Sequence, residues 1–179
     1  GFFLAGGNIF QQISLIYTDV ANSAVFTVLY VIIVPVIAYF LFSKKIHQSV
    51  WPAAIMCLAG GLLLSELDNL DVRFGDSLVI IGAFFWAFHI VFISKFLKIF
   101  NFPITIATFQ CFFGAIICLL PASALEYISI EGLLLESKEL IYAGVLSSGI
   151  AFMLQVYSQQ SLSPAPVAII FSLEGVFGA

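Results

Sequence analysis

Long apolar stretches alternate along the chain with short polar gaps, and this pattern predicts helices that cross a membrane. About 20 apolar residues in a helix span the hydrocarbon core of a bilayer, whereas membrane β-strands are shorter and alternate in polarity. The segments are rich in Leu, Ile, Val, Phe, Ala and Gly and show no such alternation. We therefore expect an all-α polytopic membrane protein, a helical bundle in which consecutive helices are antiparallel neighbours. The seven apolar segments are residues 1–17, 20–42, 50–65, 77–97, 102–121, 139–160 and 165–179.

Composition leads to the same class. Hydrophobic residues make up 62% of the 179 residues and charged residues 9%, against about 45–50% and 25% in soluble domains. The expected partner is therefore the lipid bilayer. Six basic residues in separate gaps are too few and too scattered for a nucleic-acid-binding surface. Cys57, Cys111 and Cys118 lie inside apolar segments without partners at metal-ligand spacing, so we expect no metal site and no cofactor.

The charges are sorted by sign between the gaps, which predicts an orientation. The gaps at 43–49 and 95–101 contain lysines and no acid. Nine of the ten acidic residues lie in, or at the edge of, the gaps at 17–22, 66–76 and 125–138. Loops rich in Lys and Arg stay in the cytoplasm. We expect 43–49 and 95–101 to be cytoplasmic and the acidic gaps to face outward, in the inner (plasma) membrane of a bacterium.

A weak internal repeat links the two ends of the chain. An offset of 140 residues places the first apolar segment on the sixth and the second on the seventh, and it matches Tyr17 to Tyr157 and Ser23 to Ser163. The sixth segment follows the first by five crossings, an odd number, so the second copy would cross the membrane in the opposite sense. Inverted repeats of this kind are the architecture of many secondary transporters, whose substrate site lies near the bilayer midplane between the halves.

Several stretches resemble the EamA branch of the drug/metabolite transporter superfamily. In order, they are QQISLIYTDVANSA, WPAAIMCLAGGLLLS, FGDSLVIIGAFFWAFHIVFISKF and SGIAFMLQVYSQQSLSPAPVAIIFSLEGVFGA. The resemblance covers the whole chain, and Gly75-Asp76 stands where the family opens a helix that carries a W-A motif, here Trp86-Ala87. The chain departs from the family pattern at Gly175, where Pro is usual, and at His89, where an aromatic or aliphatic residue is commoner.

The resemblance implies a parent of ten helices in two inverted halves of five. Residues 1–65 would be the last three helices of the first repeat and 66–76 an external linker. Residues 77–179 would be the second repeat, truncated in its fourth helix, so the chain would be an internal fragment from about the third to the ninth helix.

Two titratable groups inside apolar segments are candidates for substrate binding or proton coupling. Glu174 is the only carboxylate placed within an apolar run, and a charge at the midplane is expensive enough that such a residue usually faces a cavity or a partner. The alternative is a hydrogen-bonded Glu that closes a structural contact. His89 follows Trp86 by one helical turn and could relay protons, or be a neutral His bonded to a neighbouring helix.

Amide and aromatic side chains supply further candidates for substrate contact. Interhelical amides bind ligands or join helices, and Gln110 is the most central. Adjacent Gln11 and Gln12 cannot face the same way, so one of them is structural. Tyr30 and Trp86 lie deep and either line a cavity or pack. The candidates for contact are Asn8, Gln12, Gln110, Tyr30 and Trp86, with Glu174 and His89; those for hinges or close packing are Pro35, Gly149 and Gly175.

Catalytic and nucleotide-binding signatures are absent from the sequence: it has no HExxH, no GxSxG and no P-loop. We therefore expect a secondary transporter and not an enzyme. It would move a small organic metabolite, amino-acid-like or drug-like, by alternating access, driven by protons or by the substrate's own gradient. An intramembrane enzyme using Glu174 and His89 as acid and base is the alternative. A seven-helix receptor ranks third, because the repeat argues against it.

Overall fold

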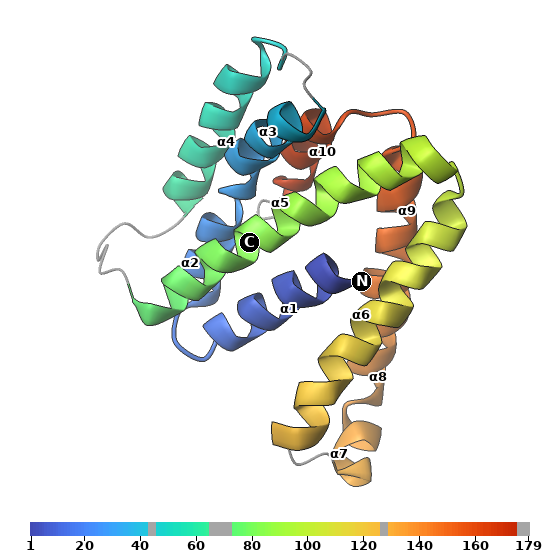
Figure 1. The fold of residues 1–179 in the computed structure, drawn as a ribbon. Coiled ribbons are helices and arrows are strands. Elements are labelled where there is room, and N and C mark those ends of the chain that lie inside the picture. Colours follow the sequence, from blue (N-terminus) through green and yellow to red (C-terminus); the bar gives the residue numbers. More distant parts are fainter. Residues whose placement is uncertain (43–45, 65–72, 126–128, 175–179) are drawn as a thin grey trace.

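The computed structural model describes residues 1–42, 46–64, 73–125 and 129–174, and it contains no strand within these ranges (Figure 1). This confirms the all-α prediction. The helices are α1 (Phe2–Ser14), α2 (Val20–Thr27), α3 (Tyr30–Phe42), α4 (Val50–Leu64), α5 (Phe74–Phe100), α6 (Pro103–Leu125), α7 (Ile130–Leu135), α8 (Ser137–Ile141), the π-helix η1 (Tyr142–Ile150), α9 (Ala151–Ser158) and α10 (Pro164–Phe171).

Four helical stretches in the described residues are long and apolar enough to cross a bilayer. They are Val20–Phe42, Phe74–Phe100, Pro103–Leu125 and Ser137–Ser158, with 22 to 27 residues each. The polytopic membrane class is therefore confirmed. Helices α1, α4 and α10 have 13, 15 and 8 residues, shorter than the length that a full crossing requires. For their three segments the crossing stays a prediction.

Two of these long stretches are not continuous α-helix. Val20–Phe42 is interrupted at Val28 and Leu29, between α2 and α3, whereas the predicted hinge Pro35 lies buried inside α3. Pro lacks the N–H that would bond the carbonyl four residues earlier. Ser137–Ser158 contains the nine-residue π-helix η1, and Gly149 lies exposed within it. The hinge and packing roles of Pro35 and Gly149 stay predictions.

Helix α5 is the centre of the bundle and runs beside α1, α2, α3 and α10 (Figure 1). Its small buried residues Ala83, Ala87 and Val91 belong to one core cluster with Val31 and Val34 of α3. Small side chains at these positions allow helix backbones to approach closely, which is the main source of packing energy between helices in lipid. In a second cluster, Ile93 and Leu97 from the C-terminal part of α5 pack with Ala107 of α6 and Val156 of α9.

The end of α1 and the end of α9 share one backbone pattern. In α1 the Ser14 hydroxyl donates to the Gln11 carbonyl at 2.6 Å, and in α9 the Ser158 hydroxyl donates to the Gln155 carbonyl at 2.8 Å. Each helix is followed by a tight turn, an extended residue and an eight-residue helix, α2 or α10. The backbone hydrogen bonds of the two turns correspond one to one. The two helix–turn–helix units therefore share one local backbone pattern, and the internal repeat stays a prediction.

The register of this shared backbone pattern differs from the offset of the predicted repeat. Gln155 follows Gln11 by 144 residues, not 140. Four residues are about one helical turn, and a shift of one turn keeps the apolar face of a helix on the same side. Matching apolar residues therefore does not distinguish an offset of 140 from one of 144 residues. The polar turns after α1 and α9 do distinguish them.

Polar contacts gather at the two opposite ends of α5. At its start, the Arg73 guanidinium pairs with Asp19 at 2.7 Å, which joins two gaps predicted to face outward. At its end, the Asn101 carboxamide oxygen accepts from Gln160 at 3.0 Å and Lys98 Nζ lies 4.4 Å from the centre of the Phe42 ring. These contacts join elements next to the gaps predicted to be cytoplasmic. Two of the three gaps predicted to face outward thus meet at the start of α5, and elements that border the two gaps predicted to be cytoplasmic meet at its end.

Candidate functional site

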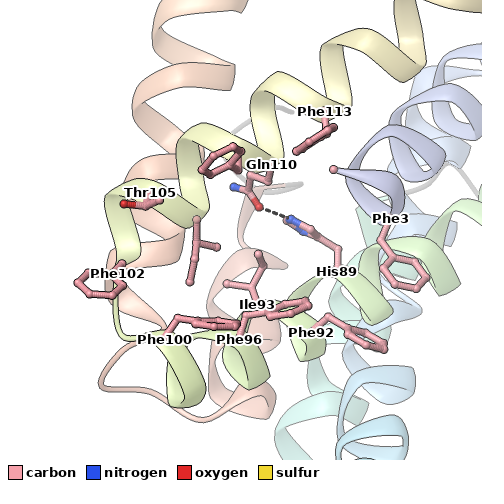
Figure 2. A pocket seen from close by; sticks show the side chains of 13 residues that line it. Phe3, His89, Phe92, Ile93, Phe96, Phe100, Phe102, Thr105, Gln110 and Phe113 are labelled. Atoms are coloured by element: carbon pink, nitrogen blue, oxygen red, sulfur yellow. Dashed lines mark hydrogen bonds between the residues drawn. The ribbon is translucent and has the colours of Figure 1, made fainter.

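A buried hydrogen bond between α5 and α6 forms the polar centre of the site. His89 Nε2 and Gln110 Oε1 lie 2.8 Å apart, and each residue is 3% exposed (Figure 2). Because a carboxamide oxygen only accepts, the His89 ring donates from Nε2. His89 Nδ1 and Gln110 Nε2 are then buried without a partner. An unpaired buried polar group costs about 1–3 kcal/mol, so these two atoms need a partner that the described residues do not supply.

Trp86 connects this pair to α1 and α9. Its indole N–H donates to the Gln11 carboxamide oxygen of α1 at 3.2 Å. Gly7 permits the approach, because a Cβ there would lie 2.9 Å from Trp86 Cε2. On the α9 side the Phe152 ring stacks on Trp86, with centroids 6.2 Å apart, and meets His89 edge-on at 6.1 Å. Four helices therefore place aromatic and amide groups around one point.

A half-open pocket of about 460 Å³ lies against the His89–Gln110 pair, between α5, α6 and the start of α1. Pockets of about 300–1,000 Å³ hold small organic ligands. Figure 2 shows Phe92, Phe96 and Phe100 in a row along α5, with the Gln110 amide on the facing helix. No charged side chain lines the pocket. Its lining side chains besides His89 and Gln110 are Phe3, Phe92, Phe96, Phe100, Phe102, Phe109, Phe113, Ile93, Ile106 and Thr105.

The structure brings together three of the predicted contact residues, His89, Trp86 and Gln110, and places the others elsewhere. Asn8 and Gln12 are exposed on α1, one helical turn apart and so on the same face. Gln11, which is not among the predicted contact residues, makes the bond to Trp86. The roles proposed for Asn8 and Gln12 stay predictions.

Tyr30 and Glu174 lie away from the pocket. Tyr30 is buried in the core cluster of α3 and α5, and it is not among the residues that line the pocket. Glu174 follows α10 and is exposed. No hydrogen bond or ion pair of the described residues joins Glu174 to His89, as the acid–base alternative would require. Gly175 lies outside the described residues.

Sequence reasoning missed a second polar cluster, at the start of α5. Asp76 belongs to a gap predicted to face outward, but its side chain is buried and the residue is 1% exposed. Its carboxylate accepts from the Thr18 hydroxyl at 2.5 Å and from the Arg73 backbone N–H at 2.8 Å. The second contact is an N-cap interaction, and the Gly-Asp pair at the start of an apolar run was the available signal. The cluster fixes the turn after α1 to α5.

Phe152 and the phenylalanines of the pocket were also missed, because Phe is so common in this chain that no single one stands out. The 179 residues contain 20 Phe. Only the packing of α5, α6 and α9 shows which of them surround His89 and Gln110.

The long apolar helices define a polytopic helical membrane protein, with a solute-sized pocket between α5, α6 and the start of α1. The model of the EamA-like transporter family matches residues 73–179, and the chain belongs to that family. The chain is also 26% identical over 171 residues to a protein of Archaeoglobus fulgidus described as an uncharacterized transporter, a match that covers 96% of this chain and 54% of the relative. The chain thus spans about half the length of that curated relative. No solved structure matched the chain.

Proposed function

We propose that the whole protein is a secondary transporter that carries a small organic solute across a cell membrane by alternating access. The observation that carries this proposal is the apolar pocket of about 460 Å³ against the buried His89–Gln110 pair, lined from α1, α5 and α6. Gln110 contacts the solute in this proposal. Trp86, which does not line the pocket, packs beside His89 and is oriented by Gln11.

The position of the pocket fits a carrier in which two halves of the protein give alternating access to a shared solute site. Helix α1 lies in residues 1–65, the predicted part of the first repeat, whereas α5, α6 and α9 lie in the predicted second repeat, 77–179. The pocket is lined from both parts. The backbone pattern that recurs after 144 residues supports a second copy of the α1–α2 unit in α9–α10, and the odd number of crossings would invert that copy. Binding sites at the junction of inverted halves are the rule in such carriers.

The energy source that we propose is an ion or solute gradient. The sequence carries no nucleotide-binding motif, and family membership supports carriage, not chemical conversion. Protons are the proposed coupling ion, with Glu174 and His89 as the groups that would bind them. The gaps at 43–49 and 95–101 face the cytoplasm in this proposal. The membrane that we propose is the inner membrane of a bacterium.

The test is a flux assay with the whole protein in liposomes. Radiolabelled amino acids, aromatic amides and other small metabolites are offered with and without an imposed proton gradient, and protein-free liposomes are the control. We expect saturable entry of at least one solute without chemical change. Failure of every solute to enter faster than in the control, or conversion of a solute without entry, would overturn the proposal. If Glu174 couples protons, Glu174→Gln removes the response to the gradient; an unchanged response excludes that role.

A further inference from the structure

Two lysines at the end of α5 have no acidic partner among the described residues. Lys95 is half-buried and Lys98 is exposed, and residues three positions apart in a helix are neighbours on its surface. In the part of the chain that the structure describes, the ion pair is that of Asp19 with Arg73, at the opposite end of α5. The gap 95–101 itself contains no acid. The two ammonium groups therefore form a site of unbalanced positive charge.

The length of α5 places these lysines at the level of the lipid headgroups. Its 27 residues, Phe74–Phe100, extend about 40 Å at about 1.5 Å per residue. A bilayer measures about 40–45 Å with its headgroup regions, and its hydrocarbon core about 30 Å. Lys98 is two residues from the end of the helix, and the long side chain of Lys95 can extend to the same level from one turn deeper. An anionic headgroup is therefore within reach of both ammonium groups.

Aromatic rings hold both ammonium groups in place. Lys98 Nζ lies 4.4 Å from the centre of the Phe42 ring, at the end of α3, and Lys95 Nζ lies 6.0 Å from the centre of the Phe92 ring. A ring face attracts a cation, but it does not replace the acceptors that the three N–H groups of an ammonium can bind. A phosphate supplies both negative charge and several acceptor oxygens.

A row of phenylalanines leads from Lys95 toward the middle of α5. Phe88, Phe92 and Phe96 follow one another at intervals of one turn, with neighbouring ring centres 6.3 Å apart, and Phe3 of α1 stacks on Phe92 at 5.1 Å. Phe96 is 44% exposed, and Phe88 and Phe92 are half-buried. This row offers apolar surface to an acyl chain, which a free phosphate ion would leave unused. Phosphate and acyl chain are combined in a phospholipid.

We propose that the end of α5 binds an anionic phospholipid, with the headgroup phosphate at Lys95 and Lys98 and an acyl chain along Phe88, Phe92 and Phe96. A zwitterionic lipid fits less well, because its headgroup brings a second cation beside the two lysines. The inference does not rest on the proposed function, since it requires only that α5 crosses a bilayer. Phe92 and Phe96 also line the pocket, so the bound lipid would lie beside the candidate site.

The experiment measures which lipid lies next to each end of α5. The whole protein, without other cysteines, carries Ile99→Cys or the control Phe74→Cys, at positions that are 62% and 67% exposed, and each Cys is labelled with bimane. The liposomes contain equal amounts of phosphatidylglycerol and phosphatidylcholine, and one lipid at a time bears a quenching nitroxide. We expect phosphatidylglycerol to be enriched about fivefold over phosphatidylcholine at position 99, which corresponds to about 1 kcal/mol for a lysine near an anionic lipid. At position 74 the ratio should be about one, because Arg73 is paired with Asp19. Equal ratios at the two positions overturn the inference.

Charge variants assign the enrichment to the lysines. The double variant Lys95→Gln, Lys98→Gln should lower the ratio at position 99 to about one. The control Arg73→Gln removes a charge at the other end of α5 and should leave the ratio at position 99 unchanged. A ratio at position 99 that stays the same without the two lysines overturns the inference. The comparison of positions 99 and 74 needs no lysine variant, so it stands even where the double variant fails to fold.

Discussion

Replacing Thr18 with Val tests the buried contact that holds the turn after α1 against the start of α5. Val keeps the shape of Thr and removes the hydroxyl that donates to the Asp76 carboxylate at 2.5 Å. Hydrogen bonds to charged groups contribute about 1.5–3 kcal/mol. The carboxylate, 1% exposed, would keep only its bond from the Arg73 N–H. We therefore expect the free energy of unfolding to fall by about 2–3 kcal/mol.

The assay is unfolding of the whole protein in mixed micelles by increasing SDS, followed by circular dichroism. The matched control is Thr108→Val, because Thr108 is exposed and its hydroxyl bonds only the Ile104 carbonyl of its own helix. The control should change stability by less than about 0.5 kcal/mol. A double-mutant cycle with Asp76→Asn should give a coupling energy of at least about 1 kcal/mol. Equal effects of Thr18→Val and Thr108→Val, or no coupling, would refute the reasoning.

Three further outcomes follow from the same contacts. Gly75→Ala would place a Cβ 2.8 Å from the Ser14 carbonyl oxygen and should lower the free energy of unfolding by about 1–3 kcal/mol. The control Gly60→Ala, whose Cβ would have no atom within 4 Å, should be neutral or stabilising by up to about 1 kcal/mol. If Gly60→Ala is the more destabilising of the two in the SDS titration, the packing at Gly75 is contradicted. Asp19→Asn should cost at most about 1 kcal/mol, and less at high salt, because its ion pair with Arg73 is exposed; a salt-independent loss above about 2 kcal/mol argues against this. Gln11→Leu should reduce solute uptake into liposomes about fivefold, which corresponds to the loss of one hydrogen bond of about 1 kcal/mol to Trp86. The control Gln12→Leu, at an exposed position, should leave uptake unchanged. Similar uptake by both variants excludes the Gln11–Trp86 contact from function.

The helix boundaries could be predicted well wherever a polar gap follows an apolar run. The segments 20–42 and 50–65 match Val20–Phe42 and Val50–Leu64 closely. Helix α5 extends three residues beyond the predicted 77–97 at each end, because helical hydrogen bonding does not stop where polar residues begin. Asp76 caps its first turn, and Lys98 lies over an aromatic ring at its last. The sequence did not indicate the π-helix η1, nor the interruption between α2 and α3.

The groups of the candidate site could be predicted, but not how they pair. His89, Trp86 and Gln110 stand out as polar or amphipathic side chains deep in apolar segments. Their contacts depend on how each helix is rotated about its axis. Because apolar residues surround these helices on all sides, the sequence does not determine that rotation. For the same reason the sequence left open which of Gln11 and Gln12 faces inward. The packing of α1 on α5 decides it in favour of Gln11.

The most direct test of the whole account is the sidedness of the two ends of the bundle. Val20 and Gln48 are both exposed and lie in the acidic gap 17–22 and the basic gap 43–49, respectively. Each is replaced by Cys in the whole protein, in a background in which Cys57, Cys111 and Cys118 are Ala, and intact cells are treated with a membrane-impermeant maleimide. The account predicts labelling at position 20 from outside, and at position 48 only after the cells are permeabilised. Labelling of both positions from outside, or of neither, would contradict a chain that crosses the membrane with its basic gaps in the cytoplasm.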